Sequence, residues 1–188
     1  CMAERQVTID NFTHPLDNLF FVIGTQNPLD LAGTYPLPLV QLDRFLLKVP
    51  MNYVGPETEL EIVKEAENIQ SYAREIKPCV SRKQILNAQE ASKNVYIHEK
   101  ILETIINIVQ DTRNNSLLQY GASTRAAIML KRALAAWALN QERNYVTDDD
   151  LKFISPFVLL HRLRFQSNIG NQLEAFTELL KPHLEKLV

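Results

Sequence analysis

The most informative stretch of the sequence is Phe20-Phe21-Val22-Ile23-Gly24-Thr25-Gln26-Asn27-Pro28, an apolar run that ends in polar amides. The continuous apolar residues 19–23, without alternation, predict a central β-strand that is covered on both faces. Such a strand would hold Asn27 at its tip, where the amide could orient a water or hydrogen-bond a phosphate oxygen. The alternative is an Asn that forms a turn before Pro28, which is a common arrangement.

Further elements are predicted on either side of this run. Upstream, Asp10-Asn11 predicts a tight β-hairpin, because both side chains tolerate positive φ. Downstream, residues 39–45 leave room for a short helix, and the apolar run 45–49 predicts a second strand. An open sheet of two or three strands is marginal by itself, so we expect a partner segment outside this chain.

From about residue 56 the apolar residues recur at helical spacing. Pro56 suits a first helical position, and Glu57 and Glu59 follow where the helix dipole favours acids. The sequence therefore predicts an α/β part followed by an all-α part. We expect a strand-containing part at residues 1–55, a connecting helix and linker at 56–78, and a helical domain at 79–188.

The helical part carries several residues that can cap a helix N-terminus. The predicted helices, with their caps, are 85–91 (Ser81 and Gln84), 101–109, about 124–140 (Ser123), 151–157 (Thr147 and Asp150) and 172–187, the last interrupted at Pro182.

Composition narrows the class of protein. Twenty basic residues balance 22 acidic ones, so no overall field attracts nucleic acid. No apolar run approaches the roughly 18 residues that would span a bilayer, and we expect a cytoplasmic protein without a membrane span. Cys1 and Cys79 form no metal-ligand cluster, and the scattered histidines suggest no metal site. Because the chain begins with Cys1, we expect a fragment of a longer protein.

Two arginines are candidate phosphate ligands. Arg125 falls in the first turn of a predicted helix, where the dipole repels a cation by up to about 1 kcal/mol. The free amides of that helix start and the guanidinium could converge on one phosphate, although an ion pair with a surface acid explains the position equally well. Arg44, in an apolar setting, could reach a neighbouring subunit's nucleotide or could pair within its own domain. The basic residues 161–164 are interpreted as the rim of a core or interface.

Two motifs of nucleotide hydrolysis are absent from the chain. No Lys is followed by Ser or Thr, so there is no phosphate-binding loop of the Gly-Lys-Ser/Thr type. No Asp-Glu pair follows an apolar strand, so the carboxylates that hold magnesium and activate water are also missing. We expect this chain alone to be inactive in hydrolysis.

Taken together, several separated segments resemble the MoxR family of AAA+ ATPases, from just after its Walker B motif onward. They occur in the family's order and cover residues 1 to about 165. The segments are Glu4 to Asp10, Phe20 to Pro28, Thr34-Tyr35-Pro36-Leu37-Pro38, Gln41-Leu42-Asp43-Arg44-Phe45, Gly121-Ala122-Ser123-Thr124-Arg125-Ala126 and Val158 to Leu163.

The resemblance implies a partial AAA+ αβα nucleotide-binding core followed by a helical lid. Asn27 would be the first sensor, Arg44 the arginine finger that acts on the next subunit's ATP, and Arg125 the second sensor on ATP in its own subunit. The intact protein would hydrolyse ATP with Mg²⁺ in a hexameric ring and would remodel or activate partner proteins. The ligands for Mg²⁺ would lie in the part that precedes this chain.

The sequence departs from the family pattern at three positions. Asn11 replaces a usual Gly, Thr124 a frequent Pro, and Leu39 an often acidic residue. Residues 166–188 carry no family motif. Two other functions stay open: a non-catalytic helical adaptor on an ATPase-like scaffold, and a DNA-associated AAA+ motor, which the absence of a dense basic hairpin disfavours.

Overall fold

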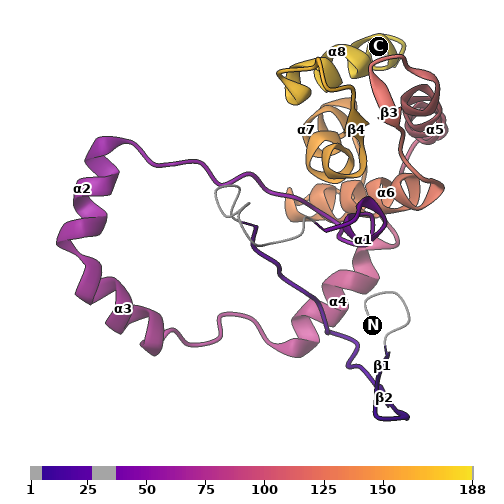
Figure 1. The fold of residues 1–188 in the computed structure, drawn as a ribbon. Helices are drawn as coiled ribbons and strands as arrows, with labels where there is room; N and C mark the ends of the chain where they lie inside the picture. The colour runs from indigo at the N-terminus through magenta and orange to yellow at the C-terminus, as the bar shows by residue number, and fades with distance from the viewer. Residues whose placement is uncertain (1–5, 27–36, 188) are drawn as a thin grey trace.

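The computed structural model describes residues 6–26 and 37–187, and most of its regular elements are helices (Figure 1). In chain order the elements are β1 (Gln6–Ile9), β2 (Phe12–Pro15), α1 (Leu39–Leu42), α2 (Pro56–Lys64), α3 (Ala66–Glu75), α4 (Arg82–Ser92), α5 (Glu99–Asn114), β3 (Leu118–Tyr120), α6 (Thr124–Asn140), α7 (Asp148–Leu159), the 3₁₀ helix η1 (Leu160–Arg162), β4 (Arg164–Phe165) and α8 (Gln172–Leu184).

The hydrophobic core lies in one helical bundle, which we define as α5 to α8 with η1 and the β3–β4 pair between them. Among the described residues, every buried hydrophobic side chain falls between Val95 and Leu180. α6 packs against α5 and α7, and α8 packs across α5 and α7. The apolar face of each helix at helical spacing builds this core, as the periodicity predicted. Among the described residues, the apolar residues with 0% exposure are Ile108, Ala126, Leu130, Leu134, Ala138, Leu151, Val158, Leu159 and Phe176.

The caps predicted at Ser81, Ser123 and Thr147 are confirmed at the starts of α4, α6 and α7, whereas α5 and α8 are capped by His98 and Asn171, which were not predicted. The Ser81 and Gln84 side chains form a capping box at α4, and Thr147 and Asp150 form another at α7. These caps satisfy backbone N–H groups that have no partner inside a helix. The predicted interruption at Pro182 is wrong, because α8 runs through it to Leu184. Pro182 lies in the last turn, where little of the helix remains to be disrupted.

The predicted hairpin is confirmed. β1 and β2 pair antiparallel, and the turn residues Asp10 and Asn11 have φ values of 47° and 71°. Asn and Asp adopt this left-handed conformation more easily than most residues, which is why the turn tolerates Asn11. A second short pair, β3 with β4, was not expected from the sequence and joins the connection after α5 to the connection before α8, with Leu118 opposite Phe165.

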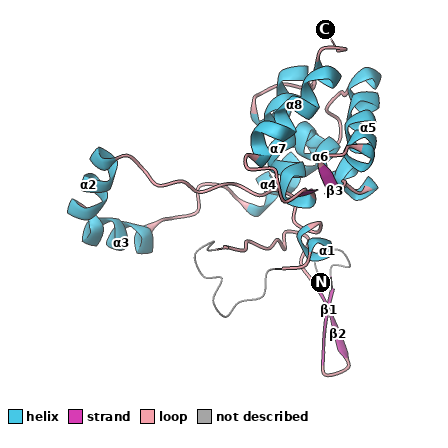
Figure 2. Ribbon diagram, turned by 45° about the horizontal axis from the view of Figure 1, so that its top comes forward, coloured by secondary structure: helices cyan, strands magenta, loops and turns pink. Residues whose placement is uncertain are grey.

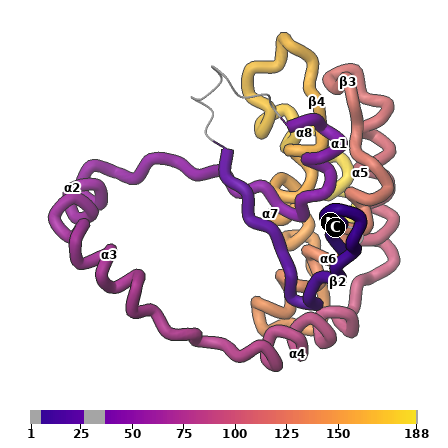
Figure 3. Tube along the Cα trace, turned by 60° about the horizontal axis from the view of Figure 1, so that its bottom comes forward, coloured from indigo at the N-terminus to yellow at the C-terminus, as the bar shows by residue number. Residues whose placement is uncertain are grey.

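The strands expected at residues 19–23 and 45–49 are absent from the described structure. Residues 20–26 carry no regular structure, and the side chains of Phe21 and Ile23 are 76% and 80% exposed. A strand is stable only when its backbone pairs with a neighbour, and no described strand lies beside either run. Residues 45–49 instead lie alongside the bundle (Figure 3). The Lys48 amide donates a hydrogen bond to the carbonyl of Phe157 in α7, 2.9 Å away. The short helix expected before them is present as α1.

α2 and α3 stand away from the bundle on extended connections (Figure 2). α2 begins at Pro56 with Glu57 and Glu59 in its first turn, as predicted, but neither helix has a buried residue. The division of the chain at residues 55 and 78 stays a prediction. Within residues 6–26 and 37–187, no helix is both long enough and apolar enough to cross a membrane.

Candidate functional site

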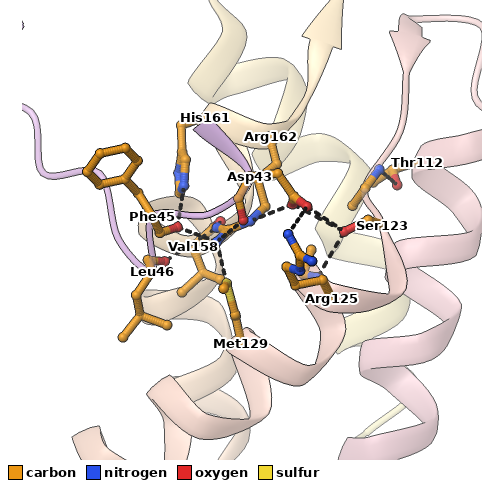
Figure 4. A network of polar contacts seen from close by, with 12 residues as sticks. Asp43, Phe45, Leu46, Thr112, Ser123, Arg125, Met129, Val158, His161 and Arg162 are labelled. Atoms are coloured by element: carbon orange, nitrogen blue, oxygen red, sulfur yellow. Dashed lines mark hydrogen bonds and ion pairs between the residues drawn. The ribbon is translucent and has the colours of Figure 1, made fainter. Parts of the chain in front are cut away.

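Polar side chains of the bundle converge on Asp43, the residue that ends α1 (Figure 4). The Ser123 hydroxyl lies 3.1 and 3.2 Å from the two Asp43 carboxylate oxygens. Arg162 donates from Nε to the same carboxylate at 3.1 Å, and Arg125 Nη1 lies 3.9 Å away. One carboxylate therefore joins the segment before the bundle to the start of α6 and to η1.

The turn that carries Arg125 is held by the end of α5. At Gly121 a Cβ atom would lie 2.5 Å from the Thr112 carbonyl oxygen, so only glycine lets the two backbones approach this closely. The Thr112 hydroxyl accepts a hydrogen bond from the Ala122 amide at 3.0 Å, and Arg113 Nε donates to the Ala122 carbonyl at 2.8 Å. These contacts fix where α6 begins, and hence where Arg125 lies.

The start of α6 presents a cation that is only loosely paired. Ser123 caps the helix by accepting from the Ala126 amide at 3.2 Å, while its hydroxyl faces Asp43. The Arg125 side chain is 47% exposed, and its contact with Asp43 at 3.9 Å is long. The structure thus contains the ion pair that was one interpretation of Arg125. Because such exposed pairs contribute only about 0–1 kcal/mol, a phosphate can compete for the guanidinium.

Arg162 is buried behind this surface, with 2% of its area exposed. Burial lowers the pKa of its guanidinium, and the charge of Asp43 opposes that shift. The neighbouring His161 faces the Phe45 carbonyl through Nε2 at 3.1 Å, and burial together with the Arg162 charge lowers its pKa to about 4. His161 is therefore a neutral donor to Phe45 at pH 7.

The structure brings two of the three sequence-predicted site residues to the same place. Arg44 follows Asp43 directly and is half-buried, in a turn where its amide donates to the Gln41 carbonyl at 3.1 Å. Arg125 contacts the Asp43 carboxylate. Asn27 lies outside the described residues.

Sequence reasoning missed Asp43 and Arg162 as members of this site. Arg162 was assigned to the rim of a core or interface, whereas it is enclosed and pairs with a residue 119 positions away. The available signal was chemical: a charged side chain in an apolar segment needs a partner of opposite charge, and both Asp43 and Arg162 occupy such segments.

Two family models match the chain, in order. Residues 1–47 match the ATPase family associated with various cellular activities (AAA), and residues 110–180 match the AAA lid domain. The second range covers most of the bundle that contains Arg125 and Arg162.

Individual relatives give the same result. YeaC of Bacillus subtilis, described as uncharacterized, is 40% identical over 162 residues, which cover 86% of this chain and 50% of YeaC. The chaperone MoxR1 of Mycobacterium tuberculosis is 35% identical over 171 residues, covering 86% of this chain and 45% of MoxR1. The crystal structure of a candidate ATPase from Cytophaga hutchinsonii superposes with a TM-score of 0.86 at 36% identity, over 97% of this chain and 59% of that one.

A segment that matches the AAA family, followed by a helical domain that matches the AAA lid, defines an AAA+ protein. Within that class, this chain belongs to the MoxR-like AAA+ ATPases. The bundle is the lid, and the fold is a partial core segment followed by that lid, as the resemblance implied. The chain spans about half the length of the curated relatives that it matches.

Proposed function

We propose that the full-length protein binds and hydrolyses ATP, and that this chain supplies the arginine finger, Arg44, and the second sensor, Arg125. The observation that carries the proposal is the shared Asp43 carboxylate. It contacts Arg125 and immediately precedes Arg44, so the backbone of Arg44 lies next to the residue that Arg125 contacts. Asn27 is proposed as the first sensor on the sequence motif alone.

The proposed chemistry is stabilisation of charge during phosphoryl transfer. A guanidinium is planar and permanently charged, and it matches phosphate oxygens with paired N–H donors. Arg125 fits an anionic ligand because it is half-exposed, loosely paired and placed at a helix N-terminus. Among residues 6–26 and 37–187, no three His, Cys, Asp or Glu side chains gather as metal ligands.

We further propose that the protein works as a homo-oligomeric ring, hexameric by family resemblance, and acts on a client protein. An arginine finger requires a neighbouring subunit, since it completes a site other than its own. MoxR1, at 35% identity, is named as a chaperone, which supports a client that is a protein.

The proposal is tested with Arg44→Ala in the full-length protein. A finger that acts only on the transition state should lower kcat by about 10³-fold or more while the Kd for ATP changes little. Steady-state ATP turnover and binding of a fluorescent ATP analogue measure the two quantities. Arg74→Ala is the control, because Arg74 lies exposed in α3 far from the site.

Mixed assemblies then locate each arginine. Subunits with Arg44→Ala should regain activity when mixed with subunits that carry a defect only in their own nucleotide-binding loop, because each partner supplies what the other lacks. An equal loss of binding and turnover in Arg44→Ala would contradict the finger role. A full-length protein that neither binds nor hydrolyses ATP would support the adaptor function instead.

A further inference from the structure

We infer that Arg162 is a positioning residue that attaches the turn carrying Arg44 to the bundle, so that the lid of a subunit sets where its own arginine finger points. The inference rests on the proposed role of Arg44. It adds a residue and a physical connection between the lid and the finger.

Arg162 holds the backbone on both sides of Arg44. Its Nη2 donates to the carbonyls of Asp43, at 3.3 Å, and of Phe45. Its Nη1 donates to the Leu46 carbonyl at 3.3 Å and to that of Val158 in the last turn of α7. The finger therefore sits between backbone groups that one side chain from the lid holds in place (Figure 4).

The guanidinium is suited to this task by its geometry and charge. It offers five N–H donors in a rigid plane, and here they face carbonyls, the Met129 sulfur at 2.7 Å and the Asp43 carboxylate at 3.1 Å. The Asp43 charge balances the cation, which is 2% exposed. A lysine at this position could keep the charge but could not reach several separated acceptors at once.

Other contacts from the bundle reinforce the attachment. His161 Nε2 lies 3.1 Å from the same Phe45 carbonyl that Arg162 binds. The Lys48 amide donates to the Phe157 carbonyl at 2.9 Å, and Ser123 donates to Asp43. Each of these partners belongs to α6, α7 or η1, so the turn is attached to the lid at several points.

A functional consequence follows from the shared carboxylate. Asp43 is bound by Arg162, which holds the finger turn, and is contacted by Arg125, which is proposed to sense nucleotide. A phosphate that draws Arg125 away from Asp43 removes one of the cations that contact the Asp43 carboxylate. This changes the electrostatic environment of the carboxylate that Arg162 binds, and Arg162 holds the turn that carries Arg44. Nucleotide state at one site is thereby coupled to the finger offered to another site.

The attachment can be tested on the 188-residue chain itself, without ATP, by hydrogen–deuterium exchange. In Arg162→Lys, the amides of Asp43, Arg44, Phe45 and Lys48, which are hydrogen-bonded here, should exchange at least tenfold faster. Amides in the middle of α5 and α6 should keep their wild-type rates. Faster exchange only near residues 43–48 distinguishes positioning from a general loss of stability.

Arg143→Lys is the matched control. Arg143 also forms a forked ion pair, with Asp150 at 2.5 and 2.8 Å, but at the start of α7 and without contact to the finger turn. This variant should leave exchange at residues 43–48 unchanged. Unchanged exchange there in folded Arg162→Lys, or equal acceleration in both variants, would overturn the inference.

Should Arg162→Lys unfold the bundle, Asp43→Asn replaces it, because this variant removes the charge that orients the Arg162 guanidinium through Nε and so weakens its hold on the turn, while the substituted side chain is itself 20% exposed. The same local acceleration is expected, and its absence in this folded variant would overturn the inference.

Turnover in the full-length protein provides the second readout. Arg162→Lys should lower kcat at least tenfold with less than a threefold change in KM, while Arg143→Lys keeps the wild-type kcat. If Arg44→Ala abolishes turnover and Arg162→Lys does not affect it, the attachment has no role and the proposed function stands. If Arg44→Ala has no effect on turnover, the proposed function fails. The attachment by Arg162 is then tested by hydrogen–deuterium exchange alone.

Discussion

At the scale of single residues, the carbonyl of Phe45 and the carboxylate of Asp43 are the partners of two buried basic side chains, His161 and Arg162. Arg162 stays charged because Asp43 and several carbonyls receive its donors. His161, beside it, has only the Phe45 carbonyl, and its buried Nδ1 has no hydrogen-bond partner among the described residues. One base is therefore held as a cation and its neighbour as a neutral ring.

The neutral state of His161 predicts how stability depends on pH. Its pKa is about 4 in the folded protein against an ordinary value of 6.5, because burial and the Arg162 charge disfavour the proton. Between these two values the unfolded chain binds a proton that the folded protein releases. The free energy of unfolding should therefore fall as the pH drops from 6.5 to 4, by on the order of 3 kcal/mol.

Urea denaturation at several pH values checks this expectation against His161→Gln, whose amide can still donate to Phe45 but does not titrate. The variant should lose less stability than the wild type over that interval. Parallel curves for the two proteins would show that His161 does not carry the effect.

Asp150 does not interfere with this test. Its pKa lies below 3.8 because the hydrogen bonds from Arg143 and Thr147 outweigh the effect of burial, so its contribution to the free energy of unfolding is lost only at lower pH.

At the scale of elements, the close approach of α5 to the turn before α6 fixes the second-sensor candidate. The contact is between backbone atoms: the carbonyl of Thr112 and the amide of Arg113 on α5, and Gly121 on the turn. Backbone atoms at a helix end cannot move aside as a flexible side chain can. The position of Arg125 therefore depends on Gly121, a residue that has no side chain with which to contact it.

Gly121→Ala is expected to destabilise the chain by about 1–3 kcal/mol, the usual cost of forcing extra atoms into a packed site. The new Cβ would lie 2.5 Å from the Thr112 oxygen and 2.6 Å from the Arg113 nitrogen. Thermal or urea unfolding measures the loss. Gly170→Ala is the matched control, since its Cβ would meet no atom within 4 Å, and a similar loss in both variants would refute the explanation.

At the scale of the whole molecule, burial is confined to one part of the chain. Among the described residues, no hydrophobic side chain before Val95 is buried, and α2 and α3 expose apolar residues such as Val63 and Tyr72, at 69% and 71%. These helices can open without cost to the core of the bundle.

Limited proteolysis should therefore separate the chain into two classes of cleavage site. Trypsin should cut at Lys64 and Arg74, in α2 and α3, at least tenfold faster than at Lys131 or Lys152, which lie in α6 and α7 of the bundle. Mass spectrometry of a time course identifies the order. Early cleavage within α6 or α7 would show that the bundle is less stable than its burial implies.

Much of the helical domain could be predicted because the relevant signals are local. Caps such as Ser81, Ser123 and Thr147 act on backbone amides a few residues away, and the left-handed turn at Asp10-Asn11 depends on those two side chains. The strands expected at 19–23 and 45–49 were wrong for the opposite reason. An apolar run indicates burial, but a strand also needs a neighbour with which to pair.

The sequence by itself determined the capped starts of α4, α6 and α7, the hairpin turn and the motifs that contain Arg44 and Arg125. Only the tertiary structure decided that Asp43 meets Ser123, 80 positions away, and Arg162, 119 positions away. The physical reason is the sequence separation over which each kind of interaction acts. Helical spacing and capping act within about one turn of helix, whereas the partner of a buried charge is chosen by how the helices pack. The cluster around Asp43 therefore could not be predicted from local sequence patterns, because it depends on how the helices pack.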